Sequence, residues 1–385
     1  MKGFHVLGVT QVSDSYPNVK YKLAAFARLL GDDYAEYVVP LDKTGSSQGF
    51  FSALGSSRLV LAWRMFAGHT KVFFYGMRHR AKRVYICYPG IFLAVLLGLP
   101  IMRRRYPVMY LDAFISLYDT IVCDRRLLSE GNIFAKLLYR LEKRAFKSAT
   151  LVIVDTPENA LYYSQLFDIP QERFQAIPLC IPPMQAVEAM TEEKPAKCIR
   201  CVFVGTFVPL QGIRTIIDAA KILSNDPEIE FVFVGDGQDA SYLQDYMNDS
   251  PNVVWHRGHF PTEFVMKQIN EADICLGIFG DGPKAQRVLP YKIYYYLALG
   301  MPTITAQTTV TERVLTESRS IDEHSPLLLV PPGDATALAE ALRQLRDDSA
   351  KLASTGRAGT AYYAKQLSDE AIDQSLREIV CEEAS

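Results

Sequence analysis

Short apolar runs, rich in β-branched and aromatic residues, alternate with amphipathic segments along almost the whole chain. The runs have the length of buried strands, and the amphipathic segments repeat apolar residues at helical spacing. Strands that alternate with helices form βαβ units, so the pattern predicts an α/β protein with mainly parallel sheets. We expect strands in two series, the first at 4–9, 34–39, 84–88, 108–111 and 151–155, the second at 199–204, 230–234, 253–256, 274–278, 303–305 and 327–330.

Helices are expected between these strands. They cover 19–30, 91–97, 132–147 and 157–166 in the first series, and 213–223, 240–247, 261–272, 290–299 and 335–345 in the second. The segment 181–197 is rich in Pro and Glu and lacks periodicity, which is typical of a linker. We therefore predict an N-terminal domain over 1–180, a linker over 181–197 and a C-terminal domain over 198–365. A last helix near 366–385 is expected to pack back on the first domain.

The composition fits two folded domains. A chain of 385 residues exceeds what one core usually supports, and 49% hydrophobic with 22% charged residues is typical of a globular protein. The net charge of −2 argues against a general affinity for nucleic acid. No apolar run reaches the roughly 20 residues of a membrane span, and the N-terminus lacks the organisation of a signal peptide, so we expect a cytoplasmic protein.

The seven cysteines are irregularly spaced, which indicates reduced thiols. Cys198 and Cys201 form a C-x-x-C pair, but no second pair or histidine cluster lies nearby in the sequence. We interpret the two as buried structural thiols, and a metal or redox site is the alternative.

One stretch of the first domain is strongly basic. From Arg58 to Arg83 there are seven Lys and Arg residues and no acidic residue, and the longest apolar run, 91–102, ends at three arginines. A solvated face would explain the basic stretch, and a core helix would explain the apolar run. The alternative is a segment that lies on anionic lipid. An anionic membrane surface is therefore a candidate partner, with peripheral attachment to the inner face of the cell membrane.

Glycines follow several expected strands of the second domain. In CVFVGTFVPLQGIR, Gly205 follows a strand and Gly212 precedes a helix, where free backbone N–H groups can bind a phosphate. FVGDGQD ends the next strand with Gly235 and Gly237, and Gly258 follows the third. Ligands of parallel sheets bind at the edge that such loops share. A plain tight turn is the alternative for each loop taken alone.

The stretch from Lys284 to Thr305, KAQRVLPYKIYYYLALGMPTIT, combines a basic run with the expected helix 290–299 and a buried strand. Its Pro can open the helix and its Gly can close it. The positive end of this helix would add to the charges of Lys284, Arg287 and Lys292. We expect these groups to bind the phosphates of a nucleotide-sugar.

The order of these blocks resembles a known family. The sequences VGTFVPLQG, FVGDGQD, NVVWHRGHFPTEFVMKQINEADICLGIF, VLPYKIYYYLALGMPTIT and LLLVPPGDATALAEAL follow one another as in the donor domain of family 4 retaining glycosyltransferases. In the first domain, YLDAFISLYDTIVCDRR and LEKRAFKSATLVIVDT resemble, more loosely, members that build bacterial surface polysaccharides. The resemblance implies a GT-B architecture, with two Rossmann-like domains facing a central cleft. The nucleotide-sugar would bind to the second domain and the acceptor to the first.

The resemblance also implies a chemistry. Such enzymes use a nucleoside diphosphate sugar as substrate, keep the anomeric configuration, and need no metal or other cofactor. The leaving diphosphate gains charge, so cations and N–H donors must lie where that charge develops. Lys292 and Arg287 are the catalytic candidates. The donor-binding candidates are Gly205, Thr206, Gln211, Gly212, Gly235, Gly237, Gly258, Lys284 and Tyr295.

The chain departs from the family pattern at four positions. Thr206 and Gln211 stand where members commonly carry Arg and Lys, and Arg287 and Tyr295 stand where they carry the two glutamates of an E-x7-E pattern. The contacts of those glutamates with sugar and ribose therefore cannot be carried over. Either the charge has moved to the basic run of 284–305, which we favour because the glycines and the run occur together, or the chain is a degenerate binding subunit.

Acceptor-side candidates lie in the first domain. Asp112 ends a strand where the family often places a catalytic His or acid, so it is a candidate catalytic general base, or else only a helix cap. Ser116 and Asp119 follow it in the sequence, and Asn18 and Lys20 lie close behind the first strand. We expect these four side chains to line an acceptor pocket.

The sequence thus favours a retaining glycosyltransferase that adds a sugar to a glycan acceptor in cell-surface polysaccharide biosynthesis, and we expect that acceptor to be lipid-linked. A catalytically silent sugar-nucleotide-binding or assembly partner is the alternative. An epimerase is disfavoured because no matching acid–base constellation is recognisable. A nicotinamide enzyme is disfavoured because no G-x-G-x-x-G follows the first strand.

Overall fold

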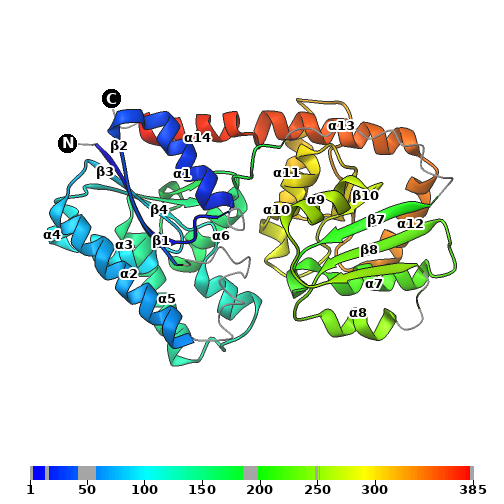
Figure 1. The fold of residues 1–385 in the computed structure, drawn as a ribbon, viewed down its shortest axis with the longest axis horizontal. Coiled ribbons are helices and arrows are strands. Elements are labelled where there is room, and N and C mark those ends of the chain that lie inside the picture. The colour runs from blue at the N-terminus through cyan, green and yellow to red at the C-terminus, as the bar shows by residue number, and fades with distance from the viewer. Residues whose placement is uncertain are drawn as a thin grey trace. The chain divides into compact units, whose positions relative to one another are not determined.

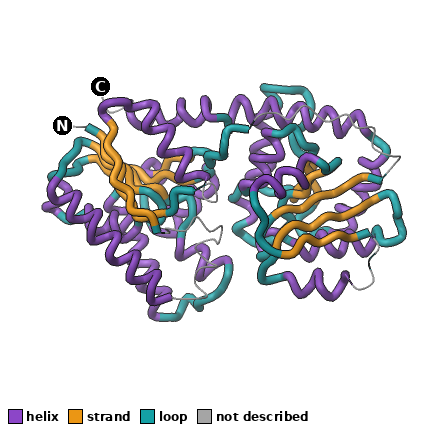
Figure 2. The backbone as a smooth tube through the Cα atoms, viewed as in Figure 1, coloured by secondary structure: helices purple, strands orange, loops and turns teal. Residues whose placement is uncertain are grey.

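The computed structural model describes residues 3–13, 17–41, 58–184, 198–247, 250 and 252–381, so most of the expected linker, 185–197, lies outside the described residues. The chain divides into two compact units. One consists of Met1–Pro182 with Asp369–Ser385, and the other of Pro183–Ser368. In each unit a sheet carries helices on both faces (Figures 1 and 2).

The sheet of the first unit has six parallel strands in the order β2-β1-β3-β4-β5-β6. They are β1 (Phe4–Thr10), β2 (Tyr34–Pro40), β3 (Arg83–Ile86), β4 (Val108–Asp112), β5 (Leu151–Val154) and β6 (Phe174–Ala176). Every residue of β1 is buried, because alternate side chains point into the two helix layers.

Helices α1 (Pro17–Leu30) and α14 (Asp369–Cys381) share one core layer of this unit, in which Leu376 packs with Phe4 and Phe26. The other layer contains α2 (Arg58–Arg78), α3 (Ile91–Leu97), α5 (Ile133–Ser148) and α6 (Pro157–Phe167), and the short α4 (Pro100–Arg103) follows α3. Leu93 and Leu97 of α3 are fully buried, so this part of the apolar run 91–102 belongs to the core. Among the helices described, none is both long and apolar enough to cross a bilayer.

The sheet of the second unit also has six parallel strands, in the order β12-β11-β10-β7-β8-β9. They are β7 (Ile199–Val204), β8 (Ile229–Gly235), β9 (Val253–Arg257), β10 (Ile274–Leu276), β11 (Thr303–Ala306) and β12 (Leu328–Val330). Counted within the unit, this is the Rossmann order 3-2-1-4-5-6, which reverses direction between β7 and β10. The predicted α/β class with two Rossmann-like parallel sheets is confirmed.

The helices of this unit are α7 (Ile213–Ile222), α8 (Ala240–Met247), α9 (Thr262–Asn270), α10 (Tyr291–Ala298), α11 (Thr309–Ser318), α12 (Ala335–Arg346) and α13 (Ser349–Gln366). Helix α7 buries Ile213, Ile216, Ile217 and Ala220, the i, i+3, i+4, i+7 spacing of a core-facing stripe. The loops after β7 and β10 therefore emerge from a rigid sheet at the point where open α/β sheets bind ligands.

Candidate functional site

Glycines hold the loops after β7 and β8 in direct backbone contact. Gly205 N–H donates to the carbonyl of Val234, and Phe207 N–H donates to the carbonyl of Asp236, both at 3.0 Å. Gly235 has a φ of +145°, and a Cβ at this position would overlap the carbonyl oxygen of Gly205. Only glycine therefore permits this approach, and the two loops form one surface at the carboxyl edge of the sheet.

The loop after β10 joins the same surface. Phe279 N–H donates to the carbonyl of Gln211 at 3.0 Å. Gly212, at φ +64°, begins α7, and a Cβ there would overlap the backbone between Phe279 and Gly280. The structure thus brings together the glycine loops after β7, β8 and β10. The sequence predicted that these loops share one edge of the sheet.

Lys292 projects from α10 into the space between these loops. Its Nζ lies 2.5 Å from Gln211 Oε1 and 3.4 Å from the carbonyl oxygen of Gly277. It also lies 3.5 Å from the centroid of the Phe203 ring, a cation–π contact. A Cβ at Gly205 would come within 3.0 Å of the ammonium, so the absence of a side chain there makes room for it.

The Lys292 ammonium is buried among neutral groups. Only 8% of the residue is exposed, and its contacts are with an amide, a carbonyl and a ring. No carboxylate of the described residues lies within ion-pair distance of it, and burial lowers the Lys292 pKa well below its usual value. A cation in this state gains most from an anionic ligand.

Two helices begin at the same edge. Helix α7 starts after Gly212 and α10 after Pro290, and neither of these two residues caps its helix with a side chain. The positive dipole ends of both helices lie at this edge, where they favour an anion. Arg214, in the first turn of α7, adds a 66% exposed guanidinium that pairs with Asp239 Oδ1 at 3.0 Å.

The other donor-side candidates lie around this centre. Thr206 is exposed, and Gly258 N–H donates to the carbonyl of Gly235 at 3.4 Å. Lys284 is half-buried before the short turn Ala285–Arg287, whose last residue, Arg287, is buried, and Tyr295 is half-buried on α10. Gly237 lies against the Phe207 backbone, where a Cβ would come within 2.6 Å of the carbonyl oxygen.

On the acceptor side, Asp112 lies inside the first unit. Its Oδ2 is 3.1 Å from Lys22 Nζ, both side chains are 1% exposed, and Tyr85 donates its hydroxyl hydrogen to the same oxygen. Phe114 N–H donates to Oδ1 at 3.3 Å. The carboxylate is thus held in a buried ion pair. Lys22 was missed by the sequence reasoning because it lies 90 positions away.

Ser116 is also buried and is bonded to Glu142 of α5, a residue that the sequence did not single out. Ser116 Oγ–H donates to Glu142 Oε2 at 2.9 Å, and the N–H groups of Leu117 and Tyr118 donate to the same carboxylate at 2.9 Å. Burial raises the Glu142 pKa to about 7 despite these donors. Asp119 N–H donates to Ser116 Oγ at 3.1 Å, so Glu142 anchors the loop after β4.

The remaining acceptor-side candidates belong to α1. Asn18 is 1% exposed, and its Oδ1 accepts a hydrogen bond from Cys180 N–H at 3.0 Å, which ties α1 to the segment after β6. Lys20 is half-buried, with Nζ 5.3 Å from the centroid of the Tyr21 ring. Asn18 therefore supports the fold, whereas Lys20 lies nearer the surface.

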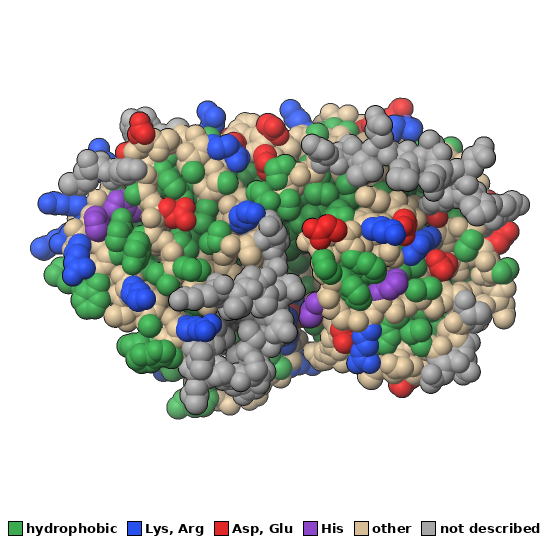
Figure 3. Space-filling view, viewed as in Figure 1, with side chains coloured by type: hydrophobic (Ala, Val, Ile, Leu, Met, Phe, Trp, Pro, Cys, Tyr) green, Lys and Arg blue, Asp and Glu red, His purple; other side chains and the backbone are tan. Residues whose placement is uncertain are grey.

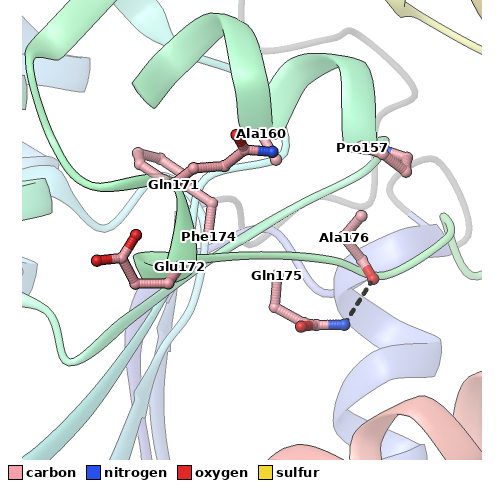
Figure 4. A pocket seen from close by; sticks show the side chains of 7 residues that line it. All are labelled: Pro157, Ala160, Gln171, Glu172, Phe174, Gln175 and Ala176. Atoms are coloured by element: carbon pink, nitrogen blue, oxygen red, sulfur yellow. Dashed lines mark hydrogen bonds between the residues drawn. The ribbon is translucent and has the colours of Figure 1, made fainter. Parts of the chain in front are cut away.

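A pocket of about 470 Å³ lies elsewhere in the first unit (Figure 4). Residues of α6, β6 and the turn Gln171–Arg173 line it, and Gln175 Nε2 donates to the carbonyl of Ala176 at 3.5 Å. The charged lining residue is Glu172, whose carboxylate would repel a diphosphate. This pocket therefore does not suit a nucleotide-sugar donor.

Metal-type ligands do not gather in the part of the chain that the structure describes, where no group of three or more His, Cys, Asp or Glu could hold an ion. The C-x-x-C pair is split, since Cys201 is buried and Cys198 is exposed. The interpretation of both as buried thiols is wrong for Cys198, because this residue precedes β7 rather than entering it.

Comparisons with known proteins show which proteins this chain resembles. Residues 198–348 match the family model described as Glycosyl transferases group 1. The structure of Anabaena Alr3699/HepE in complex with UDP and glucose aligns at 14% identity with a TM-score of 0.64, over 99% of both chains. A search of curated protein sequences gives no significant match.

Two further solved structures share the fold. Sucrose-phosphate synthase from Thermosynechococcus elongatus aligns at 16% identity with a TM-score of 0.72, over 99% of this chain and 98% of its own. The lipopolysaccharide outer core galactosyltransferase WaaB aligns at 12% identity with a TM-score of 0.61, over 98% of this chain and 99% of its own. The predicted GT-B fold is confirmed, and membership of glycosyltransferase family 4 stays a prediction.

Proposed function

We propose that this protein is a retaining glycosyltransferase that moves a sugar from a nucleoside diphosphate sugar to a glycan acceptor. The observation that supports this most strongly is the buried Lys292 ammonium at the switch point between β7 and β10. A cation held there without a carboxylate partner among the described residues is costly unless an anion binds beside it. A diphosphate has the charge and the size for the surrounding loops.

In this proposal the second unit acts on the leaving group. The bond between the anomeric carbon and the diphosphate oxygen breaks, and its electron pair stays on the diphosphate. Lys292 and the N–H groups that begin α7 and α10 stabilise this growing charge. The acceptor hydroxyl oxygen forms the new bond to the anomeric carbon, and its proton passes to an oxygen of the leaving diphosphate. We leave Asp112 out of this step, because its carboxylate is engaged by Lys22 and Tyr85.

Uridine diphosphate is the first donor base to test. The HepE structures contain UDP with glucose and UDP-glucose, and a structure of TarM from S. aureus also contains UDP. We further propose that the acceptor is a lipid-linked glycan of a cell-surface polysaccharide. The support for the lipid is the basic, apolar surface of the first unit described below.

The test begins with thermal shifts for UDP, GDP, ADP and dTDP, because at equal concentration the nucleotide that binds most tightly raises the melting temperature most. Hydrolysis or transfer of the matching nucleotide-sugars is then measured for wild type, Lys292→Ala and the exposed control Lys351→Ala. We expect Lys292→Ala to lose turnover by about a hundredfold or more and the control to keep it. Normal turnover by Lys292→Ala would refute the proposed role.

A catalytically silent sugar-nucleotide binder is the second candidate, and a specific observation favours it. Arg287 and Tyr295 occupy the two positions where related sequences carry glutamates, so two contacts to the donor are replaced. A protein of this kind would show a thermal shift with a nucleoside diphosphate but no release of that diphosphate from any nucleotide-sugar tested. Turnover above background would exclude it.

A further inference from the structure

Among the described elements, helix α2 packs on β1, β2 and α3, and one of its faces is buried. Along this face Gly68, Val72 and Gly76 are buried at i, i+4, i+8 spacing. At Gly68 the helix lies so close to the sheet that a Cβ would come within 2.8 Å of Val9. The core contact of α2 is therefore complete without the side chains on its outer face.

The outer face of α2 carries large apolar side chains. Trp63 is 68% exposed, Phe66 65%, Phe74 52% and Met77 41%. At 3.6 residues per turn these four side chains lie along one strip, away from the buried glycines. Single exposed apolar residues are ordinary, but a row of this kind marks an interaction surface.

A basic row runs beside the apolar one. Arg64, Lys71 and Arg78 are all exposed and recur every seven residues, which keeps them on one side of the helix. Between Asp42 and Asp112 the sequence contains eleven Lys and Arg residues and no acidic residue. Figure 3 shows green and blue side chains interspersed over the part of the first unit where Figure 1 draws α2.

The same combination recurs on α5. Ile133, Phe134 and Leu137 are 75%, 67% and 60% exposed in its first turns, and the exposed cations of the helix are Lys136, Arg140, Arg144 and Lys147. Its one carboxylate, that of Glu142, points into the core. Helix α3 packs against both α2 and α5, so the two helices that expose apolar and cationic groups belong to one layer.

We propose that the outer face of α2, continued by that of α5, docks on an anionic lipid bilayer. A helix with an apolar strip and flanking cations lies in the plane of a membrane interface, with the rings among the acyl chains and the cations at the headgroup phosphates. A second copy of the chain does not suit this face. Two α2 helices would bring cations against cations, with no carboxylate on either helix to pair them.

A pocket beside the apolar row gives the bilayer a further point of attachment. It has a volume of about 420 Å³, lies between α2 and β2, and is lined by Thr70, Lys71 and Arg78 together with the rings of Tyr37 and Tyr75. These two rings stack at 4.2 Å between centroids and form a rigid wall. Two cations beside such a wall suit the phosphate of one lipid headgroup.

The test uses Trp63 as its own reporter. The chain has two tryptophans, and Trp255 lies in the second unit, where its Nε1–H donates to the carbonyl of Gly235 at 2.9 Å. Purified full-length protein is mixed with vesicles of phosphatidylcholine, either pure or containing about one third phosphatidylglycerol. We expect co-sedimentation and a blue shift of the emission with the anionic vesicles only, and no shift for Trp63→Phe.

Two variants and a matched control separate the contributions. Phe66→Ser with Phe74→Ser should abolish binding, and Arg64→Gln with Lys71→Gln and Arg78→Gln should lower the partition coefficient by about tenfold or more. The control changes three exposed cations of the second unit to Gln, namely Lys267, Arg319 and Lys351, and should bind as wild type does. All these side chains are exposed, and melting curves verify that each variant is folded.

Three results would overturn the proposal: no wild-type binding to anionic vesicles, equal binding by the α2 variants, or a dimer of the wild type that the Phe66→Ser, Phe74→Ser protein does not form. The last result would assign the face to a second copy. The assay contains no sugar nucleotide and no acceptor, so its outcome is independent of the proposed glycosyl transfer.

Discussion

The Lys292 ammonium donates a hydrogen bond of 2.5 Å to the side-chain amide oxygen of Gln211. Gln211 stands where related sequences commonly carry a lysine, and a second ammonium at this distance would repel the first. The two positions therefore form a pair in which α10 supplies the charge and the glycine loop supplies a neutral acceptor. This pairing explains how a chain without the usual loop lysine still places a cation at the switch point.

Changing Gln211→Glu should weaken binding of a nucleoside diphosphate by about tenfold or more, because the new carboxylate would neutralise Lys292 and repel the phosphates. Isothermal titration calorimetry measures the affinity. Gln344→Glu, an exposed change on α12 in the same unit, is the control for added negative charge. Unchanged affinity in the Gln211 variant would show that the diphosphate binds elsewhere.

Lys292→Met should make the second unit more stable by about 1 kcal/mol, because it removes a buried charge. Burial lowers the Lys292 pKa in the folded state, while the unfolded chain keeps the usual value of 10.5. The burial of the charge therefore destabilises the wild type most below the folded-state pKa of Lys292. This destabilisation disappears as the pH rises to the pKa of the unfolded state.

Urea unfolding of both proteins at several pH values tests this. The advantage of the Lys292→Met variant should shrink as the pH rises toward 10.5, the pKa of lysine in the unfolded chain. A destabilised Lys292→Met protein would mean that the contacts of the ammonium stabilise the fold by more than its burial destabilises it.

Gly235→Ala should destabilise the second unit by about 2 kcal/mol and abolish nucleotide binding. The added Cβ would overlap the carbonyl of Gly205 at a φ that is unfavourable for alanine. Gly282→Ala is the matched control, since no atom lies within 4 Å of the Cβ position there. Thermal melts with and without the nucleotide compare the two variants, and equal behaviour would refute the steric argument.

Glu142→Gln should cost the first unit about 1–3 kcal/mol, because an amide NH2 would face N–H or O–H donors that now share two carboxylate oxygens. It should also change the pH dependence. Because the Glu142 pKa rises to about 7 on folding, its contribution to stability is present at acid pH and is lost as the pH rises through about 7. Denaturant unfolding near pH 5 and near pH 8 should show this decline in wild type and not in the variant.

The sequence predicted the parts of the fold that local pattern controls. Strand β7 and helix α8 begin and end at the predicted residues, because apolar spacing and flanking turns define both ends. Helix α2 was not predicted: it is apolar on its outer face as well as its inner one, so it lacks the periodicity of a surface helix. Strand β6, with three residues, is too short to leave a signal.

The site was predictable only where its residues are close in sequence. The glycine loops and the start of α10 follow from strand-end signals and from the order of the motifs. The contact between Gln211 and Lys292 spans 81 positions, and the pair of Lys22 with Asp112 spans 90, so neither could be seen in a local pattern. Glu142 was missed for the same reason, since it lies in a run of charges that reads as a solvated face.

The central claim is that Lys292 receives the diphosphate of the donor, and one calorimetric experiment tests it directly. The nucleoside diphosphate with the largest thermal shift is titrated into wild type and Lys292→Met at a mildly alkaline pH, in buffers of different ionisation enthalpy. We predict that wild type binds with net proton uptake, because a bound diphosphate raises the pKa of Lys292 that burial lowers, and that Lys292→Met does not bind. Equal affinity of the two proteins, with no difference in proton uptake, would contradict the account.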